Sequence, residues 1–193
     1  MENVDRGVFL SYNRSMKMIV KQNAIVLTLR IILPIACLLW MAFILNNSMQ
    51  TGVQSSAQSS TVVETVQRVA KAIAPESIIA NATGESYDKL HLLVRSCAHF
   101  AEFAVLGVLF GWCYFAYTLQ WKLFFVPTLL AILVAVVDEW IQSFVEGRGW
   151  EMIDLLLDGF GGVAGILFAA LSVVIGLLIY EKRTQGKVNK LKK

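Results

Sequence analysis

The chain has 193 residues, of which 56% are hydrophobic and only 16% are charged, and its mean hydropathy is +0.61. A chain this apolar and poor in charge is not an ordinary soluble domain, so we expect an integral membrane protein. Its formal net charge of +3 matters less than the positions of the basic residues, which flank the hydrophobic segments. Because no stacking aromatic residues are interleaved with them, these basic tails indicate membrane topology and no nucleic-acid binding.

Four segments are long and apolar enough to be transmembrane helices, which need about 20 mostly apolar residues. They predict an all-α integral membrane bundle with spans at about 24–45, 98–119, 123–145 and 153–180. A cleaved signal peptide is the alternative for the first span, but its long lead and the lack of a clear cleavage motif favour a retained anchor. We therefore expect a basic N-terminal segment, a transmembrane domain and a basic tail, at 1–23, 24–180 and 181–193.

The basic residues also predict the orientation of the chain in the cell membrane. Basic tails at both ends and an even number of spans place both termini in the cytoplasm by the positive-inside rule. The turn at Trp121-Lys122 is then cytoplasmic as well. A long loop at 46–97 and a short connection at 146–150 would lie outside.

The long outer loop changes character along its length. Its first part, 49–61, is rich in Ser, Thr and Gln and has too few apolar residues to pack. Thr61-Val-Val-Glu64 then reads as a capping box that opens an amphipathic helix ended by Pro75, with Val62, Val66, Val69 and Ile73 on one face. We expect this helix to lie on the outer membrane surface or to cover the bundle, with partner binding as the alternative.

Three of the predicted spans carry polar residues at a similar depth. These are Arg95, His99 and Glu102 in the second span, Asp138, Glu139 and Gln142 in the third, and Asp154 and Asp158 in the fourth. At 1.5 Å per residue, the acids lie roughly 7 to 14 Å below the outer boundary. A charge facing lipid at depth costs at least about 2.5 kcal/mol, so these side chains must face one another. This convergence predicts a functional site, although a structural polar core is the alternative.

The chemistry of the predicted site is that of acids and bases. The candidate catalytic residues are His99, Glu102, Asp138, Glu139 and Asp154, and the candidate substrate-binding residues are Arg95, Gln142, Arg148 and Asp158. Crowded, desolvated carboxylates can divide into one that donates a proton and one that accepts it. His99 with several carboxylates could also bind a divalent metal that activates water, but no second histidine joins the cluster. The sequence therefore leaves both the metal and any other cofactor unknown.

Two glycine patterns predict how the polar residues are brought together. Gly107-x3-Gly111 lies in the second span and Gly161-x3-Gly165 in the fourth. Small residues at this spacing let transmembrane helices approach closely.

At these residues the chain resembles the VanZ family of polytopic membrane proteins, over about three quarters of its length. The motifs are Arg95-x2-Ala-His99-Phe-x-Glu102-Phe-x2-Leu-Gly107, Asp138-Glu139-x2-Gln142-x-Phe-x2-Gly147-Arg148 and Asp154-x3-Asp158-x2-Gly161-x3-Gly165. The chain departs from the family at Asp158, where asparagine is usual, and at Glu146, where proline often precedes the Gly-Arg turn. The resemblance implies an envelope location and a link to glycopeptide or lipoglycopeptide resistance in Gram-positive bacteria, but no particular reaction.

The resemblance and the polar cluster together lead to one main functional hypothesis. We expect an envelope protein that lowers susceptibility to teicoplanin-type glycopeptides by binding or modifying a lipid-linked wall component at an outward-facing intramembrane site. Its partners would be the lipid bilayer and a lipid-linked cell-wall precursor or a glycopeptide.

The first alternative is an acid/base or metal-dependent hydrolase or transferase with a housekeeping envelope role. The second, a proton or ion transporter, would need a polar path through the inner halves of the spans, which have almost none. The sequence leaves open whether the protein is an enzyme and what its oligomeric state is.

Overall fold

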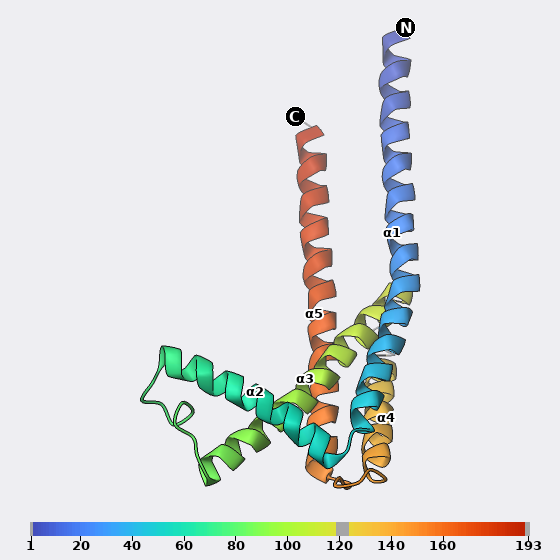
Figure 1. Cartoon of the computed structure of the whole chain (residues 1–193). Coiled ribbons are helices and arrows are strands. Elements are labelled where there is room, and N and C mark those ends of the chain that lie inside the picture. Colours follow the sequence, from blue (N-terminus) through green and yellow to red (C-terminus); the bar gives the residue numbers. More distant parts are fainter. Residues whose placement is uncertain (1, 119–123, 192–193) are drawn as a thin grey trace.

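The computed structural model describes residues 2–118 and 124–191, and the described residues are helical, with no strand. The helices are α1 (Glu2–Ser48), α2 (Gly52–Ile73), α3 (Glu85–Tyr117), α4 (Phe125–Gln142) and α5 (Met152–Leu191). Figure 1 shows how they are arranged. The predicted all-α fold is confirmed.

Among the described residues, four helices have stretches long and apolar enough to cross a membrane: Ala24–Ser48, Glu85–Tyr117, Phe125–Gln142 and Met152–Tyr180. Many of their large apolar side chains face away from the bundle, as Leu38 and Phe168 do with 65% and 58% of their surface exposed. Contact with lipid explains this exposure, because a bilayer solvates such side chains. The chain is therefore a multi-pass membrane protein.

The apolar stretches differ from the predicted spans chiefly in α3 and α4, whereas α1 and α5 continue as helix beyond theirs, to Glu2 and Leu191. The helix containing the second span already begins at Glu85 rather than near residue 98. The third span was expected to reach residue 145, but α4 ends at Gln142, where tight turns take over: the Phe144 amide donates to the Ile141 carbonyl at 3.0 Å. The predicted turn at Trp121-Lys122 lies outside the described residues, as do the expected end of the second span at 119 and the start of the third at 123.

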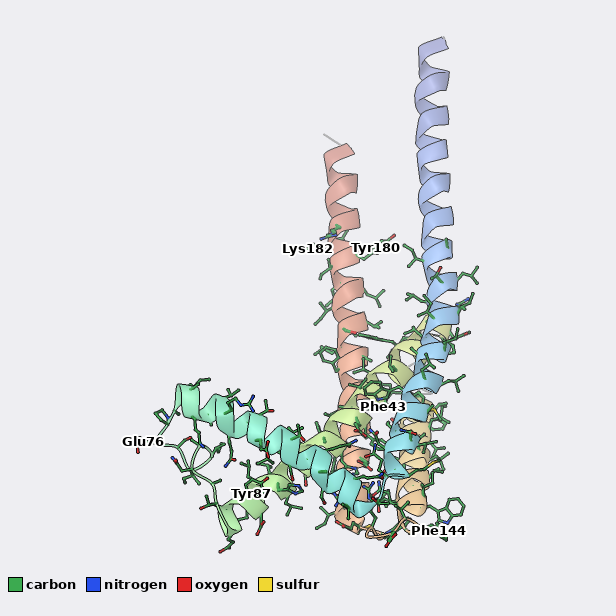
Figure 2. The ribbon with its side chains drawn as sticks, in the orientation of Figure 1. Phe43, Glu76, Tyr87, Phe144, Tyr180 and Lys182 are labelled. Carbon is green, nitrogen blue, oxygen red and sulfur yellow. The ribbon has the colours of Figure 1, made fainter. Side chains whose placement is uncertain are left out.

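Both termini lie at one end of the molecule, beyond which α1 and α5 project (Figure 1). At the opposite end, α1 finishes, α2 begins and the connection at 143–151 joins α4 to α5 (Figure 1). We call this the α2 end of the bundle. Tyr180 and Lys182 mark where the apolar stretch of α5 stops, well along the projecting part of the helix (Figure 2).

Close packing of α3 against α5 rests on the predicted glycines. A Cβ atom added at Gly107 would collide with the carbonyl of Gly162, and one added at Gly165 would collide with the carbonyl of Ala104. A Cβ atom added at Gly111 would likewise collide with the Cβ atom of Ala169. The prediction of a close helix approach is confirmed, and this approach brings the polar residues of α3 and α5 together.

The prediction for the start of the amphipathic helix is wrong. The stretch expected to be too polar to pack is helical from Gly52, because Thr51 and Gln54 form the capping box: the Thr51 hydroxyl accepts from the Gln54 amide at 3.3 Å, and the Gln54 side chain accepts from the Thr51 amide at 3.0 Å. Thr61 lies inside the helix and returns its hydroxyl to the Ala57 carbonyl at 3.1 Å. Such bonds satisfy hydroxyl groups within a helix, so a polar stretch can remain helical.

A small core joins α2 to the first turns of α3 and to the connection between them. It consists of Val63, Ala82 and Leu90, with Tyr87 and Val94 packed against it. Val63 is fully buried, whereas Val69 and Ile73 on the predicted apolar face are 52% and 80% exposed. The main bundle has a separate core, formed by Ile44, Phe103, Leu106, Val134 and Ala135.

Candidate functional site

A cavity of about 560 Å³ lies at the α2 end of the bundle and is lined by α1, α2, α3, α4 and the connections at 74–84 and 143–151. One part of its wall is polar, with Asn47, Ser48, Arg95, His99, Glu102, Asp138, Gln142 and Arg148. Another part is apolar, with Val62, Val66, Ile79, Leu90, Leu93 and Val94. The wall therefore combines charged side chains with apolar ones, and α2 contributes Ser55, Gln58 and Ser59 as well as Val62 and Val66.

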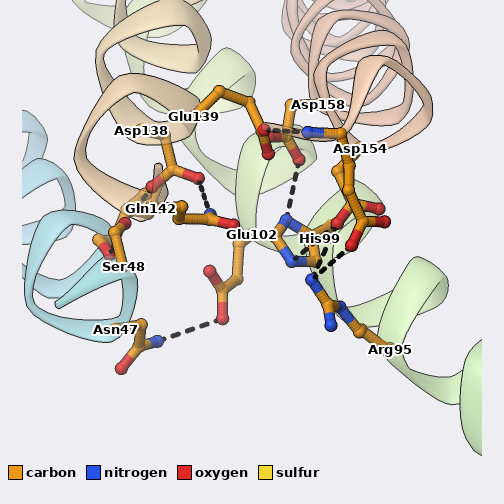
Figure 3. Close-up of polar contacts among 12 residues, drawn as sticks. Asn47, Ser48, Arg95, His99, Glu102, Asp138, Glu139, Gln142, Asp154 and Asp158 are labelled. Atoms are coloured by element: carbon orange, nitrogen blue, oxygen red, sulfur yellow. Dashed lines mark hydrogen bonds and ion pairs between the residues drawn. The ribbon is translucent and has the colours of Figure 1, made fainter. Parts of the chain in front are cut away.

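The polar contacts between α3 and α5 centre on His99 (Figure 3). Its Nδ1 atom lies 3.2 Å from Asp158 Oδ1, and its Nε2 atom lies 3.8 Å from Asp154 Oδ2. Arg95, one turn before His99 on α3, contacts the same Asp154 oxygen through Nη2 at 3.1 Å. The two nitrogens of one imidazole are thus each faced by a carboxylate, which fixes the ring orientation.

The contacts between α1, α3 and α4 hold the other two acids of the cavity. The Ser48 hydroxyl contacts both Asp138 and the Ile44 carbonyl, the latter at 2.9 Å, and the Gln142 amide donates to the second oxygen of Asp138 at 2.5 Å. Glu102 accepts from Asn47 Nδ2 at 3.1 Å. Asp138 is 2% exposed, so these neutral donors replace the water that the carboxylate has lost.

Arg148 reaches the cavity from the connection between α4 and α5. Its Nη1 atom donates to the Asn47 carbonyl at 3.4 Å, and its Nε atom is buried without a hydrogen-bond partner. Burial lowers the pKa of the Arg148 guanidinium from its ordinary value, and the positive charge of Arg95 lowers it further. The group still carries its charge at neutral pH, because an arginine titrates far above that range. It is therefore a cation with unused donor capacity.

The backbone at Gly147 positions Arg148. Gly147 has a φ of 73°, which favours glycine, and a Cβ atom added to Gly52 would collide with the Gly147 carbonyl. The Gly52 amide donates to the Glu146 carbonyl at 2.9 Å. The start of α2 and the Gly147 turn thus lock together beside the cavity.

The structure brings most of the sequence-predicted site residues to one place. Arg95, His99, Glu102, Asp138, Gln142 and Arg148 line the cavity, whereas Asp154 and Asp158 are buried and contact His99 from α5. Glu139 is fully buried and does not line the cavity; its Oε2 accepts from the Glu151 amide at 2.8 Å. This contact suits a role in holding the start of α5 to α4.

Sequence reasoning did not assign Asn47 and Ser48 to the site. They end α1 in the polar triplet Asn46-Asn47-Ser48, directly after a long apolar run, and that change was the available signal. Asn47 contacts both Glu102 and Arg148, and Ser48 contacts Asp138. The first span thus contributes to the site as well as anchoring the chain.

Comparison with known proteins identifies the family of the chain. A model of the VanZ/LLP1 family matches residues 33–176, which include every polar residue of the cavity wall. No curated protein and no solved structure is significantly similar to the chain. The match covers well over half of the chain, so this four-span membrane protein belongs to the VanZ/LLP1 family.

Proposed function

We propose that the protein acts in the cell envelope by binding the anionic head group of a lipid-linked wall component, and that this lowers susceptibility to teicoplanin-type glycopeptides. The observation that carries the proposal is the buried Arg148 Nε, a charged donor without a partner at the polar end of a cavity whose other end is apolar. A buried donor without an acceptor costs free energy, which a phosphate oxygen would recover.

The shape of the cavity supports a lipid as the ligand. Its apolar lining includes Val62 and Val66 of α2 and Leu90, Leu93 and Val94 of α3. A molecule with an acyl or prenyl chain and a charged head group would place its chain against these residues and its head against Arg148. Binding sites generally combine a mostly apolar lining with a few polar groups that fix orientation.

The proposed orientation places the cavity where wall precursors are exposed. The basic residues of both tails put the termini inside by the positive-inside rule. The α2 end lies opposite the termini, so it faces outward in this orientation (Figure 1). A lipid-linked precursor in the outer leaflet would then reach the cavity from the membrane.

Teicoplanin susceptibility of a sensitive Gram-positive host tests the proposal. The host expresses the wild type, Arg148→Gln or the matched control Arg68→Gln, with membrane levels equalised by immunoblot. Arg68 is exposed on α2 and does not line the cavity. We expect protection by the wild type and by Arg68→Gln, and loss of protection by Arg148→Gln. Equal protection by all three, or protection by none, would contradict the proposal.

A second candidate is an acid/base hydrolase or transferase that acts on the same class of lipid. It is favoured by His99, whose ring faces the cavity while two carboxylates approach its two nitrogens at 3.2 and 3.8 Å. In this version Glu102 or Asp138 is the general base and His99 relays the proton. The variant that removes the base, Glu102→Gln or Asp138→Asn, would then abolish turnover of the lipid while leaving its binding intact, whereas a binding protein would show no turnover in any form.

A further inference from the structure

We propose that His99, Asp138 and Asp158 form a divalent-cation site at the polar end of the cavity. One ligand atom from each residue lies within 4.8 Å of the other two, although the residues come from α3, α4 and α5. Figure 3 shows the three side chains around a common space. The inference deepens the proposed function, because the ion would lie where the lipid head group is proposed to bind, and it is tested below without lipid or antibiotic.

The spacing is close to that of a coordination shell. With metal–ligand bonds of about 2.1 Å, neighbouring ligands of an octahedral ion lie about 3 Å apart and opposite ligands about 4.2 Å apart. The 3.2 Å between His99 Nδ1 and Asp158 Oδ1 fits a neighbouring pair. All separations lie within 4.8 Å, so a shell with opposite ligands about 4.2 Å apart needs a closure of at most roughly half an ångström, which side-chain adjustment on binding can supply.

Buried oxygens without partners point to a cation in the same space. Asp158 is fully buried, and its Oδ2 atom has no hydrogen-bond partner. Gln142 is 1% exposed, and its Oε1 atom has none either. The Gln142 amide group is oriented by its Nε2, which donates to Asp138, so the free atom must be the carbonyl oxygen. Carboxylate and amide oxygens left without donors are the ligands that a hard cation takes.

The charge balance around the three residues also favours a cation. Arg95 is engaged by Asp154 at 3.1 Å and Glu151 at 3.7 Å. Within the described part of the chain, Asp138 forms no salt bridge, and His99 is the partner of Asp158. Three carboxylates buried in the bundle, those of Asp138, Asp158 and Glu139, therefore have one imidazole beside them. A divalent ion would balance the charges of Asp138 and Asp158 at once.

Asp154 lies at the second ring nitrogen of His99, where metal-binding histidines usually have a hydrogen-bond acceptor. If Nδ1 binds the ion, Nε2 remains to donate to Asp154, whose Oδ2 lies 3.8 Å away and is itself held by Arg95 at 3.1 Å. A carboxylate on the far nitrogen fixes the tautomer and raises the basicity of a metal-binding imidazole. Asp154 is thus a positioning residue. A donor set of one imidazole and several oxygens suits Mn²⁺ or Zn²⁺, and the open side of the ion would face the cavity.

The test is Mn²⁺ binding by the full-length protein in lipid nanodiscs after removal of metal with a chelator. The electron paramagnetic resonance signal of free Mn²⁺ gives the affinity and stoichiometry, and electron spin echo modulation detects a nitrogen bound to the ion. We expect one Mn²⁺ per chain with nitrogen modulation in the wild type. The modulation should disappear in His99→Gln, and the affinity should fall at least about tenfold in Asp158→Asn.

Glu151→Gln is the matched control, because it removes a carboxylate close to the site but outside the three ligands. Its Mn²⁺ affinity should equal that of the wild type. The proposal is overturned if the folded wild type binds no Mn²⁺ at millimolar concentration, if the bound ion shows no nitrogen modulation, or if Glu151→Gln and Asp158→Asn lose affinity equally. Binding of an anionic lipid to the metal-free protein, measured separately, shows whether the proposed function stands without the ion.

Discussion

At the scale of single residues, the site depends on buried polar groups that satisfy one another across helices. Asp138 has two neutral donors, Ser48 from α1 and Gln142 from its own helix. Glu102 has Asn47, and the Glu102 carbonyl accepts from the Trp40 indole at 2.9 Å. The arrangement keeps charged groups in a membrane bundle while leaving Arg148 with unused donor capacity.

Removing the Ser48 hydroxyl tests how far Asp138 depends on it. Ser48 is 2% exposed, so Ser48→Ala leaves a carboxylate oxygen without its donor in a place that water does not reach. We expect the free energy of unfolding to fall by about 1 to 3 kcal/mol. Thermal or denaturant unfolding of the purified protein in detergent measures the change.

Ser60→Ala is the control for this prediction, because the Ser60 hydroxyl only returns to a carbonyl of its own exposed helix, at 2.9 Å from the Ser56 oxygen. Its stability should match that of the wild type. Equal stability of Ser48→Ala and the wild type would mean that the contact between Ser48 and Asp138 contributes nothing measurable.

The residues of the polar site were largely predictable from the sequence. Ionisable side chains within apolar spans are conspicuous, and the helical rise places those of three helices at one depth. The division of roles among them was not predictable, because it depends on tertiary contacts. Glu139 adjoins Asp138 in the sequence but does not line the cavity, and one of its carboxylate oxygens accepts from the Glu151 amide.

At the scale of helices, the close approach of α3 and α5 brings His99 to Asp154 and Asp158. Glycines make this approach possible, and their spacing was visible in the sequence. The start of α2 was not, because three candidate capping boxes, beginning at Thr51, Ser55 and Thr61, lie within fifteen residues and only tertiary structure distinguishes them. The helix begins at the first of them, where Gly52 contacts the Gly147 turn.

Gly165→Ala tests the role of the α3–α5 contact. The added methyl group would collide with the Ala104 carbonyl, so the helices must separate. Overpacking of this kind costs about 1 to 3 kcal/mol. We expect a lower melting temperature in detergent, together with weaker binding of any ligand that needs both His99 and Asp158.

Gly176→Ala provides the comparison, because nothing lies within 4 Å of a Cβ atom at that position of the same helix. Its stability should equal or slightly exceed that of the wild type, since alanine favours helices over glycine by up to about 1 kcal/mol. A similar loss in both variants would assign the effect to α5 itself and not to its packing against α3.

At the scale of the whole molecule, the account rests on the orientation of the bundle. The structure places both termini at one end and the cavity at the other (Figure 1). This arrangement was predictable from the even number of spans. The side of the membrane on which each end lies is a prediction from the basic residues, since a helix bundle is the same structure in either orientation.

Labelling of intact cells with a membrane-impermeant thiol reagent tests the orientation. In a background without the native cysteines, Cys37, Cys97 and Cys113, we introduce Glu76→Cys near the end of α2 or Gln185→Cys in the C-terminal part of α5. Both positions are exposed. We expect labelling at 76 in intact cells and labelling at 185 only after permeabilisation. The reverse pattern would place the cavity inside and remove the basis for a direct role at the cell surface.

The most direct test of the central claim is to measure the binding of an anionic, lipid-linked wall precursor to the purified protein by native mass spectrometry. Wild type and Arg68→Gln should retain one lipid per chain, and Arg148→Gln should lose it, because Arg148 holds the unused donor at the polar end of the cavity. Retention of the lipid by Arg148→Gln, or no lipid on the folded wild type, would contradict the account.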